Sequence, residues 1–578
     1  MRVCKLSLPS SALILSAISL CCPYLSAQTP PAAPPTPPTV RVYSREVVVD
    51  INVTDAQGKP VHDLTQADFA VKEDGKPIYP RSFREHRSDQ QDADAPSPAP
   101  ALAPNTFAND GPPAAALPLD MLLFDATDTP IATQAVVRQR MAEFVDKLTP
   151  GTRLAVFGLS PTGQLTLVQG FTSDRDLLKK ALKSHKLDLS IAPLEDFGQE
   201  PTDNIAPDPP TTGAPAPRST NALLAQSQQV DLNVECNHAA ARAAYAESAL
   251  TQIARFTSGM PGRKNLVWFT GAFSPRMRDK QGGLCYDSGP DMRLAVGLLD
   301  HSHVAVYPVD PRALDALARN DPTAYPVRIS VFEHETMDSI AEGTGGKAFY
   351  NTNDLAGAAL QAIDAGSNYY ALSYSPTYLN DDTRRHNINV AVDKPGLTLL
   401  YMTAYHAVPP GETTASSKQV DKATPLQSAM MRGTLEPSEI LFHVGIGSGA
   451  ATESALLPNN AADPKVMKPP YRHLTLSYLI DLNGIQFDPS PDGNYHGQFE
   501  YAVNVYNSAD GRLLNSSALA AKPSLPPAAY QSMLAGGAKL RQEIDVPASG
   551  EYILRVGVHD LTSDRVGAIE IPTSAIHP

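Results

Sequence analysis

Beyond its first 27 residues the sequence lacks any run of roughly 18 consecutive apolar residues, so no later segment is expected to cross a membrane as a helix. Positive charge is also scarce, because 47 Lys and Arg residues stand against 61 Asp and Glu residues. A surface of this sign repels phosphate backbones, which argues against a nucleic acid as partner. The motif Gly-x-Ser-x-Gly is absent, and no serine is placed with a recognisable base, so nothing indicates a serine hydrolase.

Two other kinds of site are suggested only superficially. His301 and His303 flank Ser302, but no further zinc ligands occur at a suggestive spacing. The glycines of Gly445–Gly449 resemble a dinucleotide-binding loop, but no helical pattern follows them. We therefore expect no organic cofactor and no enzymatic activity.

Cysteine is rare, and three of the five cysteines lie in the first 27 residues. That segment has the pattern of a secretion signal, with Arg2 and Lys5 before an apolar run and a small residue, Ala27, at the cleavage point. An uncleaved anchor is the alternative. We expect an exported protein in the periplasm, on the outer surface or secreted, and a disulfide between Cys236 and Cys285, with two free buried thiols as the alternative.

Proline-rich stretches divide the rest of the chain into modules. Before the central part, turn signals separate short β-branched segments, which predicts a small all-β module. The sequence predicts the following order: a signal peptide at 1–27, a Pro-rich tether at 28–39, a small β module at 40–86, a Pro/Ala-rich linker at 87–118, a central domain at 119–378 with a disordered insertion at 187–221, trailing strands at 379–407, a linker at 408–435 and a C-terminal β-sandwich-like module at 436–578.

In the central part, buried strands alternate with amphipathic helices. An apolar strand at 120–125 is followed by helical spacing up to Leu148, then by two strands, and the alternation continues to a strand at 369–374. A long Ala-rich helix is expected at about 235–257. This order predicts a multidomain protein whose central domain is an α/β doubly wound, mostly parallel, Rossmann-like sheet flanked by all-β modules.

The loop after the first central strand, in LLFDATDT, carries the groups that a hard divalent cation prefers. Asp125, Thr127 and Thr129 present a carboxylate and two hydroxyls at alternate positions. Because the carboxyl ends of neighbouring strands meet at one sheet edge, the segment Thr270–Gly271 and Asp310 are expected beside them. The pattern suggests weak Mg²⁺ or Mn²⁺ binding or, alternatively, a loop that keeps the scaffold without the ion.

Both this loop and the strand order resemble the von Willebrand factor type A domain, whose metal-ion-dependent adhesion site uses Asp-x-Ser-x-Ser, a Thr from a second loop and an Asp from a third. A narrower resemblance is to the von Willebrand type-A-related exported proteins of acidobacteria, and it spans residues 40 to 405. The segments that carry it are VTDAQGKPVHDLTQADFAVKEDGKPI (53–78), PGRKNLVWFTGAF (261–273), VAVYPVDPRAL (304–314), IAEGTGGKAFYNTNDL (340–355) and YYALSYSP (369–376).

Carried over to this chain, the first loop of the family site matches Asp125, Thr127 and Thr129. The third loop departs from the family, because Gly271 after Thr270 stands where an Asp is usual. The second-loop threonine is open between Thr220, Thr211 and Thr212. The loss of one carboxylate lowers the expected affinity for a metal ion, and Asp128 or Asp310 are the residues that would compensate for it.

The resemblance and the missing catalytic motifs favour a non-enzymatic protein that binds an extracytoplasmic partner, or mediates adhesion, through a degenerate metal-ion-dependent adhesion site. Its binding edge is expected at Asp128, Thr270 and Gly271. The alternative is a cell-envelope scaffold or assembly factor in which the α/β domain is structural and the β modules make the contacts. No membrane span is expected after removal of the signal.

Overall fold

The computed structural model describes twelve segments of the chain. The predicted signal and tether lie outside the described residues, as do Thr211, Thr212 and most of the predicted insertion at 187–221. The described residues are 47–87, 102–109, 119–129, 131–184, 218–260, 262–271, 275–278, 284–312, 331–376, 385–406, 424–462 and 465–577.

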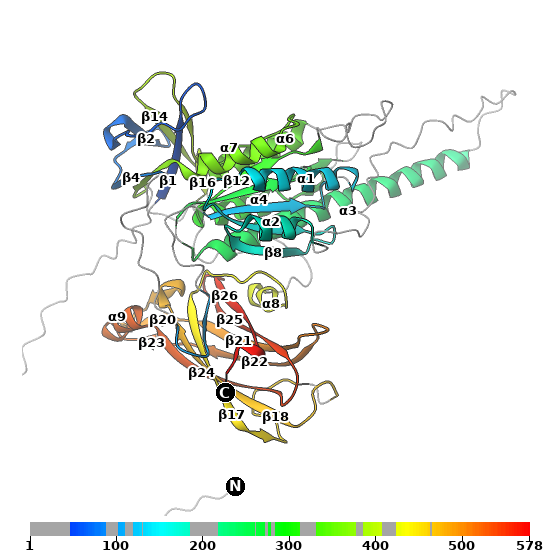
Figure 1. Ribbon diagram of the computed structural model, residues 1–578, viewed down its shortest axis with the longest axis vertical. Coiled ribbons are helices and arrows are strands. Elements are labelled where there is room, and N and C mark those ends of the chain that lie inside the picture. Colours follow the sequence, from blue (N-terminus) through cyan, green and yellow to red (C-terminus); the bar gives the residue numbers. More distant parts are fainter. Residues whose placement is uncertain are drawn as a thin grey trace, which may run out of the picture. The chain divides into compact units, whose positions relative to one another are not determined.

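A sheet flanked by helices forms the centre of the α/β domain (Figure 1). It has five strands in the order β12-β9-β6-β7-β8. Its strands are β6 (Leu119–Asp125), β7 (Arg153–Leu159), β8 (Leu165–Thr172), β9 (Lys264–Phe269) and β12 (Val304–Val309). The pairs β6–β7, β6–β9 and β9–β12 are parallel, and β8 is antiparallel to β7. All seven residues of β6 are buried, because this strand is central and both faces of the sheet are covered.

Helices cover both faces of this sheet. Successive strand side chains point to opposite faces, so Leu122 and Phe124 of β6 belong to one hydrophobic cluster and Met121 and Leu123 to another. The first cluster is completed by α1 (Ile131–Lys147), α2 (Arg175–Leu182) and α7 (Leu355–Ser367), and the second by α3 (Arg218–Thr257), α4 (Gly289–His301) and α6 (Val331–Thr344). The predicted fold class, an α/β domain flanked by β modules, is confirmed.

The long helix α3 is the largest departure from the predicted helices. The sequence predicts it from about residue 235, but it starts at Arg218 and ends, as predicted, at Thr257. Thr220, the candidate second-loop ligand, therefore lies in the first turn of a helix, and the structure does not describe its side chain. Among the described helices, none is both long and apolar enough to cross a bilayer.

The small β module is built from two stretches of chain that flank the α/β domain. It contains two four-stranded sheets, β15-β1-β13-β4 and β16-β14-β2-β3, which share one hydrophobic cluster. The first stretch supplies β1 (Val47–Thr54), β2 (Phe69–Glu73), β3 (Lys76–Ile78) and β4 (Ser82–His86). The second supplies β13 (Tyr369–Tyr374), β14 (Arg385–Val392), β15 (Thr398–Leu400) and β16 (Ala404–His406).

This pairing corrects the expected place of β13. The alternation of strands and helices assigns Tyr369–Tyr374 to the central sheet, but β13 pairs antiparallel with β1 and β4 instead. At the edge of the central sheet beside β12, the described residues form a single bridge, between Val309 and Phe349. An apolar alternating strand satisfies either sheet, so its sequence does not specify which backbone it pairs with.

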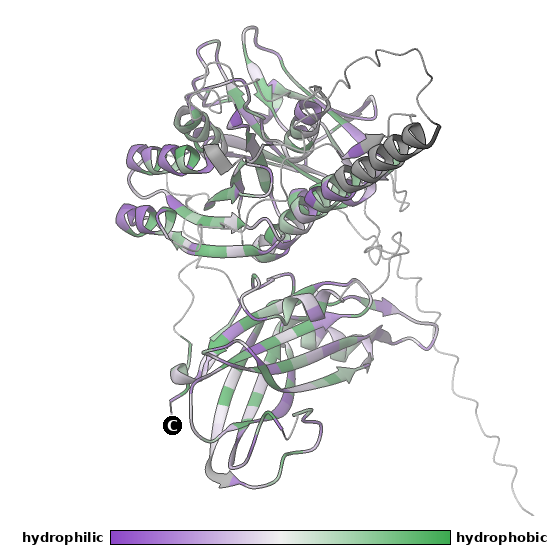
Figure 2. Cartoon of the chain, turned by 90° about the vertical axis from the view of Figure 1, so that its right-hand side faces the viewer, coloured by the Kyte–Doolittle hydropathy of each residue, from purple (hydrophilic) through white to green (hydrophobic). Residues whose placement is uncertain are grey.

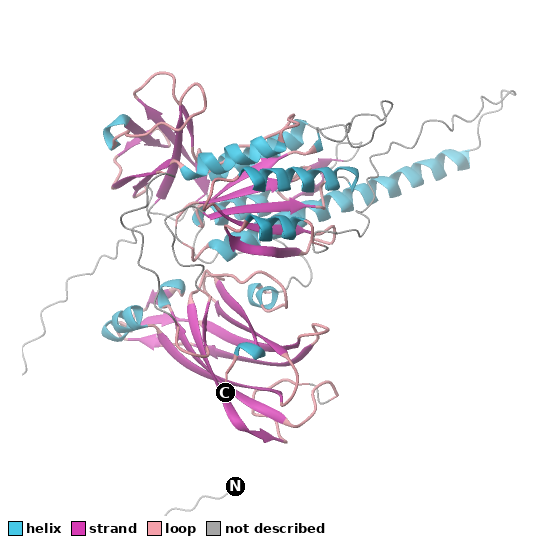
Figure 3. Cartoon of the chain, viewed as in Figure 1, coloured by secondary structure: helices cyan, strands magenta, loops and turns pink. Residues whose placement is uncertain are grey.

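The C-terminal module is almost entirely β-structure (Figure 3). Its two main sheets have the orders β24-β18-β17-β5 and β22-β21-β25-β26 around one core, and hydrophobic and hydrophilic residues alternate along many of the strands (Figure 2). The long strands are β17 (Phe442–Glu453), β18 (Tyr471–Ile480), β21 (Phe499–Asn507), β22 (Leu513–Ala521), β24 (Ala538–Pro547), β25 (Tyr552–Asp560) and β26 (Val566–Pro572). Shorter elements are α8 (Pro425–Ala429), α9 (Pro527–Gly536), β19 (Phe487–Pro489), β20 (Tyr495–Gly497) and β23 (Ser524–Leu525).

One strand of this module comes from far upstream in the sequence. The sequence predicts a linker throughout 87–118, but Thr106–Ala108 forms β5 and pairs antiparallel with β17. The buried Asn109 side chain donates to the carbonyl oxygen of Ile440 at 2.8 Å and accepts from the amide of Phe442 at 2.8 Å. These bonds satisfy backbone groups of the segment that leads into β17, which would otherwise need water as a partner. Part of the predicted linker is therefore a structural element of the module.

Candidate functional site

The loops after β6, β9 and β12 meet at the carboxyl edge of the central sheet. We call the residues Asp125, Thr127–Thr129, Thr270–Gly271 and Asp310 the rim. The Asp125 carboxylate binds both loops that flank it: one oxygen accepts from the amides of Thr127 at 2.9 Å and Asp128 at 3.3 Å, and the other accepts from Thr270 Oγ1 at 3.0 Å and Trp268 Nε1 at 3.3 Å. Burial raises the pKa of Asp125, and these hydrogen bonds oppose that rise.

The two threonine hydroxyls of the loop differ in their environment. Thr127 Oγ1 donates to the carbonyl oxygen of Ser160 at 2.9 Å, which fastens the loop to the end of β7. Thr129 Oγ1 is buried and has no hydrogen-bond partner among the described residues, as is also true of Asp128 Oδ2. A buried oxygen without a partner is unfavourable, so these two atoms are the least satisfied groups of the rim.

The rim is less exposed than the sequence suggests. Exposed fractions are 0% for Asp125 and Thr270, 1% for Thr129 and Asp310, and 9% for Thr127. The prediction of an exposed edge made of these side chains is therefore wrong. Asp125, Thr127, Thr270 and Asp310 bond to other groups of the protein, and the donors that the Asp125 carboxylate accepts from both loops hold that carboxylate inward.

Gly271 explains why the third-loop carboxylate is missing. A Cβ added at Gly271 would lie 1.8 Å from the carbonyl oxygen and 2.9 Å from the carbonyl carbon of Asp128. Both atoms belong to the backbone and cannot rotate away. The two loops thus approach so closely that no side chain fits at position 271, and an Asp there is incompatible with this arrangement of the loops.

Two arginines supply positive charge at the rim. Arg242 of α3 lies with its Nε 3.1 Å from Asp128 Oδ1, and the two side chains are 33% and 2% exposed. Burial and the neighbouring Asp125 raise the pKa of Asp128 well above its usual value, while Arg242 and Arg312 act to lower it. The acidic loop is therefore paired with cations that belong to the chain.

Asp310 forms a second ion pair. Arg312 contacts both of its carboxylate oxygens, with Nε at 3.0 Å from one and Nη2 at 2.8 Å from the other, and it also binds Glu333 at 2.7 Å. His334 Nε2 lies 3.1 Å from Asp310 Oδ2. A bidentate guanidinium occupies the lone pairs that a carboxylate would otherwise offer to a metal ion.

These contacts test whether the rim suits the metal ion that the family resemblance implies. Magnesium prefers about six oxygen ligands in octahedral array. Both oxygens of Asp125 already accept protein hydrogen bonds, Asp310 is paired with Arg312, and Gly271 offers no ligand. Within the described ranges, no three or more His, Cys, Asp or Glu side chains are grouped so as to hold a metal ion. With Arg242 and Arg312 paired to Asp128 and Asp310, the rim does not offer a donor set that fits a divalent cation.

A disulfide braces the helix that carries Arg242. Cys236 of α3 is bonded to Cys285 of β11 (Leu284–Asp287), which confirms the predicted pair. The strand β11 pairs with β10 (Arg276–Arg278), and this hairpin follows β9 in the chain. Burial raises the pKa of Tyr286 to about 12, and the charges of Arg242 and Asp128 act on the same phenol. The hairpin is thus within electrostatic reach of the rim.

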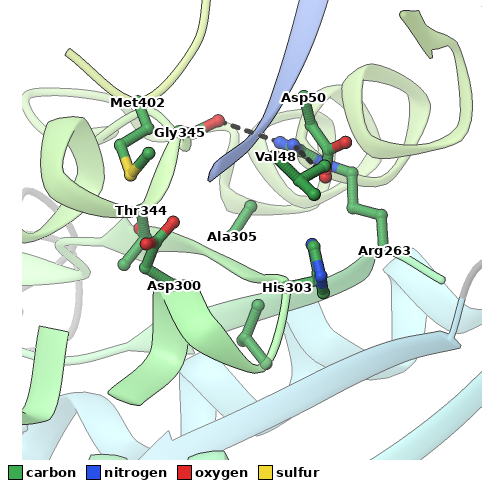
Figure 4. Close-up of a pocket in the computed structure, with 10 residues that line it drawn as sticks. Val48, Asp50, Arg263, Asp300, His303, Ala305, Thr344, Gly345 and Met402 are labelled. Carbon is green, nitrogen blue, oxygen red and sulfur yellow. Dashed lines mark hydrogen bonds and ion pairs between the residues drawn. The ribbon is translucent and has the colours of Figure 1, made fainter. Parts of the chain in front are cut away.

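A second polar cluster lies where β1 of the small β module meets the α/β domain (Figure 4). Asp50 pairs with Arg263 at 3.4 Å, and Arg263 donates to the carbonyl oxygen of Gly345 at 2.9 Å. Burial and then Asp50 raise the pKa of Asp300 to about 8, and burial lowers the pKa of His303. Arg263 compensates the charge of Asp50, and the pKa shifts of Asp300 and His303 favour their neutral forms where the two domains join. We therefore interpret the cluster as part of that joint.

The residues that sequence reasoning missed are Arg242 and Arg312. Arg312 lies two positions after Asp310, a spacing at which the arginine can fold back onto the carboxylate in a turn. The sequence therefore contained a local indication of this ion pair. Arg242 is the one charged residue within AAARAAYA, a helical stretch of small residues that packs against the sheet. A charge within such a stretch indicates a specific partner, although the sequence does not say which.

Comparisons with known proteins add little to this topology. No protein-family model and no curated protein matches the sequence. Among solved structures, an aerotolerance-related membrane protein from Bacteroides fragilis is 13% identical, over 43% of this chain and 98% of that chain, with a TM-score of 0.23. A von Willebrand factor type A protein from Catenulispora acidiphila is 10% identical, over 57% and 73%, with a TM-score of 0.23. The pilus adhesin SpaC from Lactobacillus rhamnosus GG is 10% identical, over 89% and 88%, with a TM-score of 0.23. At such scores the fold rests on the strand order itself.

Proposed function

We propose that this chain is an exported, non-enzymatic protein that binds another protein at the carboxyl edge of its central sheet. We also propose that it belongs with the type-A-related exported proteins of acidobacteria that its sequence resembles, and that its partner is extracytoplasmic. The binding surface would be the outer side of the rim and the β10–β11 hairpin beside it. The described residues exposed there include Arg242, Arg276 and Asp287, with side chains 33%, 61% and 27% exposed.

The observation that carries this proposal is the convergence of three strand-end loops into one rigid edge. Asp125 binds Thr270 across two loops, and the Asp128 backbone packs against Gly271. At the rim, the hydroxyls of Thr127 and Thr270 donate to a carbonyl and a carboxylate oxygen rather than to a histidine base. A nucleophile needs such a base to be activated, so the geometry supports a surface for binding rather than for turnover.

The alternative function has a specific observation in its favour. Tyr79, in the turn between β3 and β4 of the small β module, is 87% exposed, which is unusual for a large aromatic side chain. In the C-terminal module, Leu513 is 45% exposed at the start of β22. If the protein is an envelope scaffold, these modules would make the contacts and the α/β domain would be a spacer.

Site-specific crosslinking distinguishes the two functions. A benzophenone amino acid would replace one residue at a time: Arg276 beside the rim, Tyr79 in the small module or Leu513 in the C-terminal module. The control position is Leu177 of α2, which is 44% exposed and lies on another part of the α/β domain. After irradiation of the full chain in its native envelope, we expect a discrete adduct from position 276 and none from 177. Adducts only from 79 or 513 would instead support the scaffold, and adducts from none of the four would contradict both functions.

A further inference from the structure

Arg242 lies on a segment of α3 whose backbone is fixed beside the rim. It projects from α3 six residues after Cys236, a rise of about 9 Å along the helix, and that cysteine fixes the helix to β11. The following residues Ala243, Ala246 and Leu250 are buried against the sheet, so the helix cannot rotate without losing its core contacts. Arg242 therefore presents its guanidinium to Asp128 from a fixed backbone.

Arg242 and Asp128 form an unequal pair. The carboxylate is almost completely buried, whereas the arginine side chain is one-third exposed, so the carboxylate has lost most of its hydration and depends on the guanidinium. Asp128 Oδ1 lies 3.1 Å from Arg242 Nε, an ion pair without a hydrogen bond between these two atoms, while Oδ2 has no hydrogen-bond partner among the described residues. The buried Thr129 hydroxyl nearby in the loop is also without one. The loop thus keeps two oxygens that a cation would bind, with a guanidinium next to them.

We infer that the Arg242 guanidinium is the resident cation of the rim, taking the place of the divalent ion that this kind of loop would otherwise hold. A tethered guanidinium is present at every rim and cannot diffuse away, whereas a free ion must both displace it and lose its own hydration shell. Arg312 neutralises the neighbouring Asp310 in the same way. The rim therefore excludes divalent ions, and, resting on the proposed function, capture of a partner there proceeds in the presence of a chelator.

The test is a manganese titration of the full chain without any partner, followed by calorimetry and by the electron paramagnetic resonance signal of free Mn²⁺. Three single variants, together with Thr129→Val alone and combined with Arg242→Gln, are compared with the wild type. Arg242→Gln removes the cation, and Arg242→Lys keeps a positive charge at the same place. Lys179→Gln is the matched control, because the Lys179 side chain of α2 is also 33% exposed and pairs with a carboxylate, that of Asp146 on α1, at 2.9 Å.

We expect no binding to the wild type, Arg242→Lys or Lys179→Gln up to about 1 mM Mn²⁺, the range of weak extracellular sites. Arg242→Gln should gain a site of roughly 0.1 mM affinity, and 1 mM Mn²⁺ should raise its unfolding temperature by about 4 °C. The double variant Arg242→Gln/Thr129→Val should lose that gain, because it removes the unpaired hydroxyl.

Two results would overturn the inference: Mn²⁺ binding to the wild type that Thr129→Val abolishes, or a folded Arg242→Gln variant that binds no Mn²⁺. Because no partner is present, these results are independent of the crosslinking at position 276. A chain that crosslinks nothing at the rim but gains manganese in Arg242→Gln would refute the proposed function and keep the tethered cation.

Discussion

Replacing Gly271 by alanine tests the close approach of the loops after β6 and β9. The new Cβ would lie 1.8 Å from the Asp128 carbonyl oxygen, far inside the contact distance, and it would meet backbone rather than a movable side chain. Overpacking of this kind typically costs 1–3 kcal/mol, and a fixed backbone neighbour places the cost at about 3 kcal/mol. For a domain of this size, that corresponds to a fall of about 6–12 °C in unfolding temperature.

The single tryptophan makes this measurement specific to the α/β domain. Trp268 is 1% exposed in β9, so its fluorescence reports that domain while the β modules remain silent. Gly170→Ala in β8 is the control, because a Cβ there meets nothing within 4 Å. We expect the control to unfold within about 2 °C of the wild type. If Gly271→Ala unfolds at the temperature of the control, the loops do not approach as described and the explanation for the missing carboxylate fails.

Three further outcomes are expected. Burial raises the pKa of Asp120 to about 8, so the folded state keeps a proton on this carboxyl group that the unfolded state releases near pH 4. The stability that comes from the retained proton is therefore fully present below pH 4 and is lost as the pH rises to 8. Urea titrations at pH 5 and pH 8 should therefore differ less in Asp120→Asn than in the wild type, and an unchanged difference would contradict the assignment. The Cys236–Cys285 disulfide closes a loop of 49 residues, so its reduction, or the substitution Cys236→Ser, should lower the free energy of unfolding by about 4 kcal/mol. The measurement is the fall in melting temperature when dithiothreitol is added. The Cys236→Ser variant should show no further fall with the reductant. Arg263→Met should cost about 3–5 kcal/mol because it leaves the buried Asp50 carboxylate unpaired, and Asp50→Asn/Arg263→Met should recover part of that loss in the same unfolding assay.

The elements of the α/β domain could be predicted because their apolar periodicity is strong. The run before Asp125 is apolar and forms β6, and helical spacing after Asp354 gives α7 within one residue of the prediction. Local pattern determines such elements when one face must be buried. The same pattern could not assign Tyr369–Tyr374 to a sheet, since partner choice depends on backbone groups that lie hundreds of residues away.

The candidate site was only partly accessible from the sequence. The contact between Asp125 and Thr270 follows from the rule that the ends of parallel strands meet, so the first and third loops could be placed together. Arg242 could not be placed, because its position depends on how α3 packs on the sheet. The burial of the rim was also missed: an Asp-x-Thr-x-Thr loop looks identical whether its oxygens face solvent or one another.

The way the chain passes through the small β module has a mechanical consequence. The strands β1 and β13 are antiparallel neighbours, and β1 also pairs with β15, so the chain leaves this module at residue 87 and re-enters it at residue 369. A force applied between residues 47 and 406 therefore acts on the hydrogen bonds between these paired strands. The α/β domain bears none of that force until those bonds break. Under such a force the central sheet stays intact and unstrained until the first of these strand pairs separates.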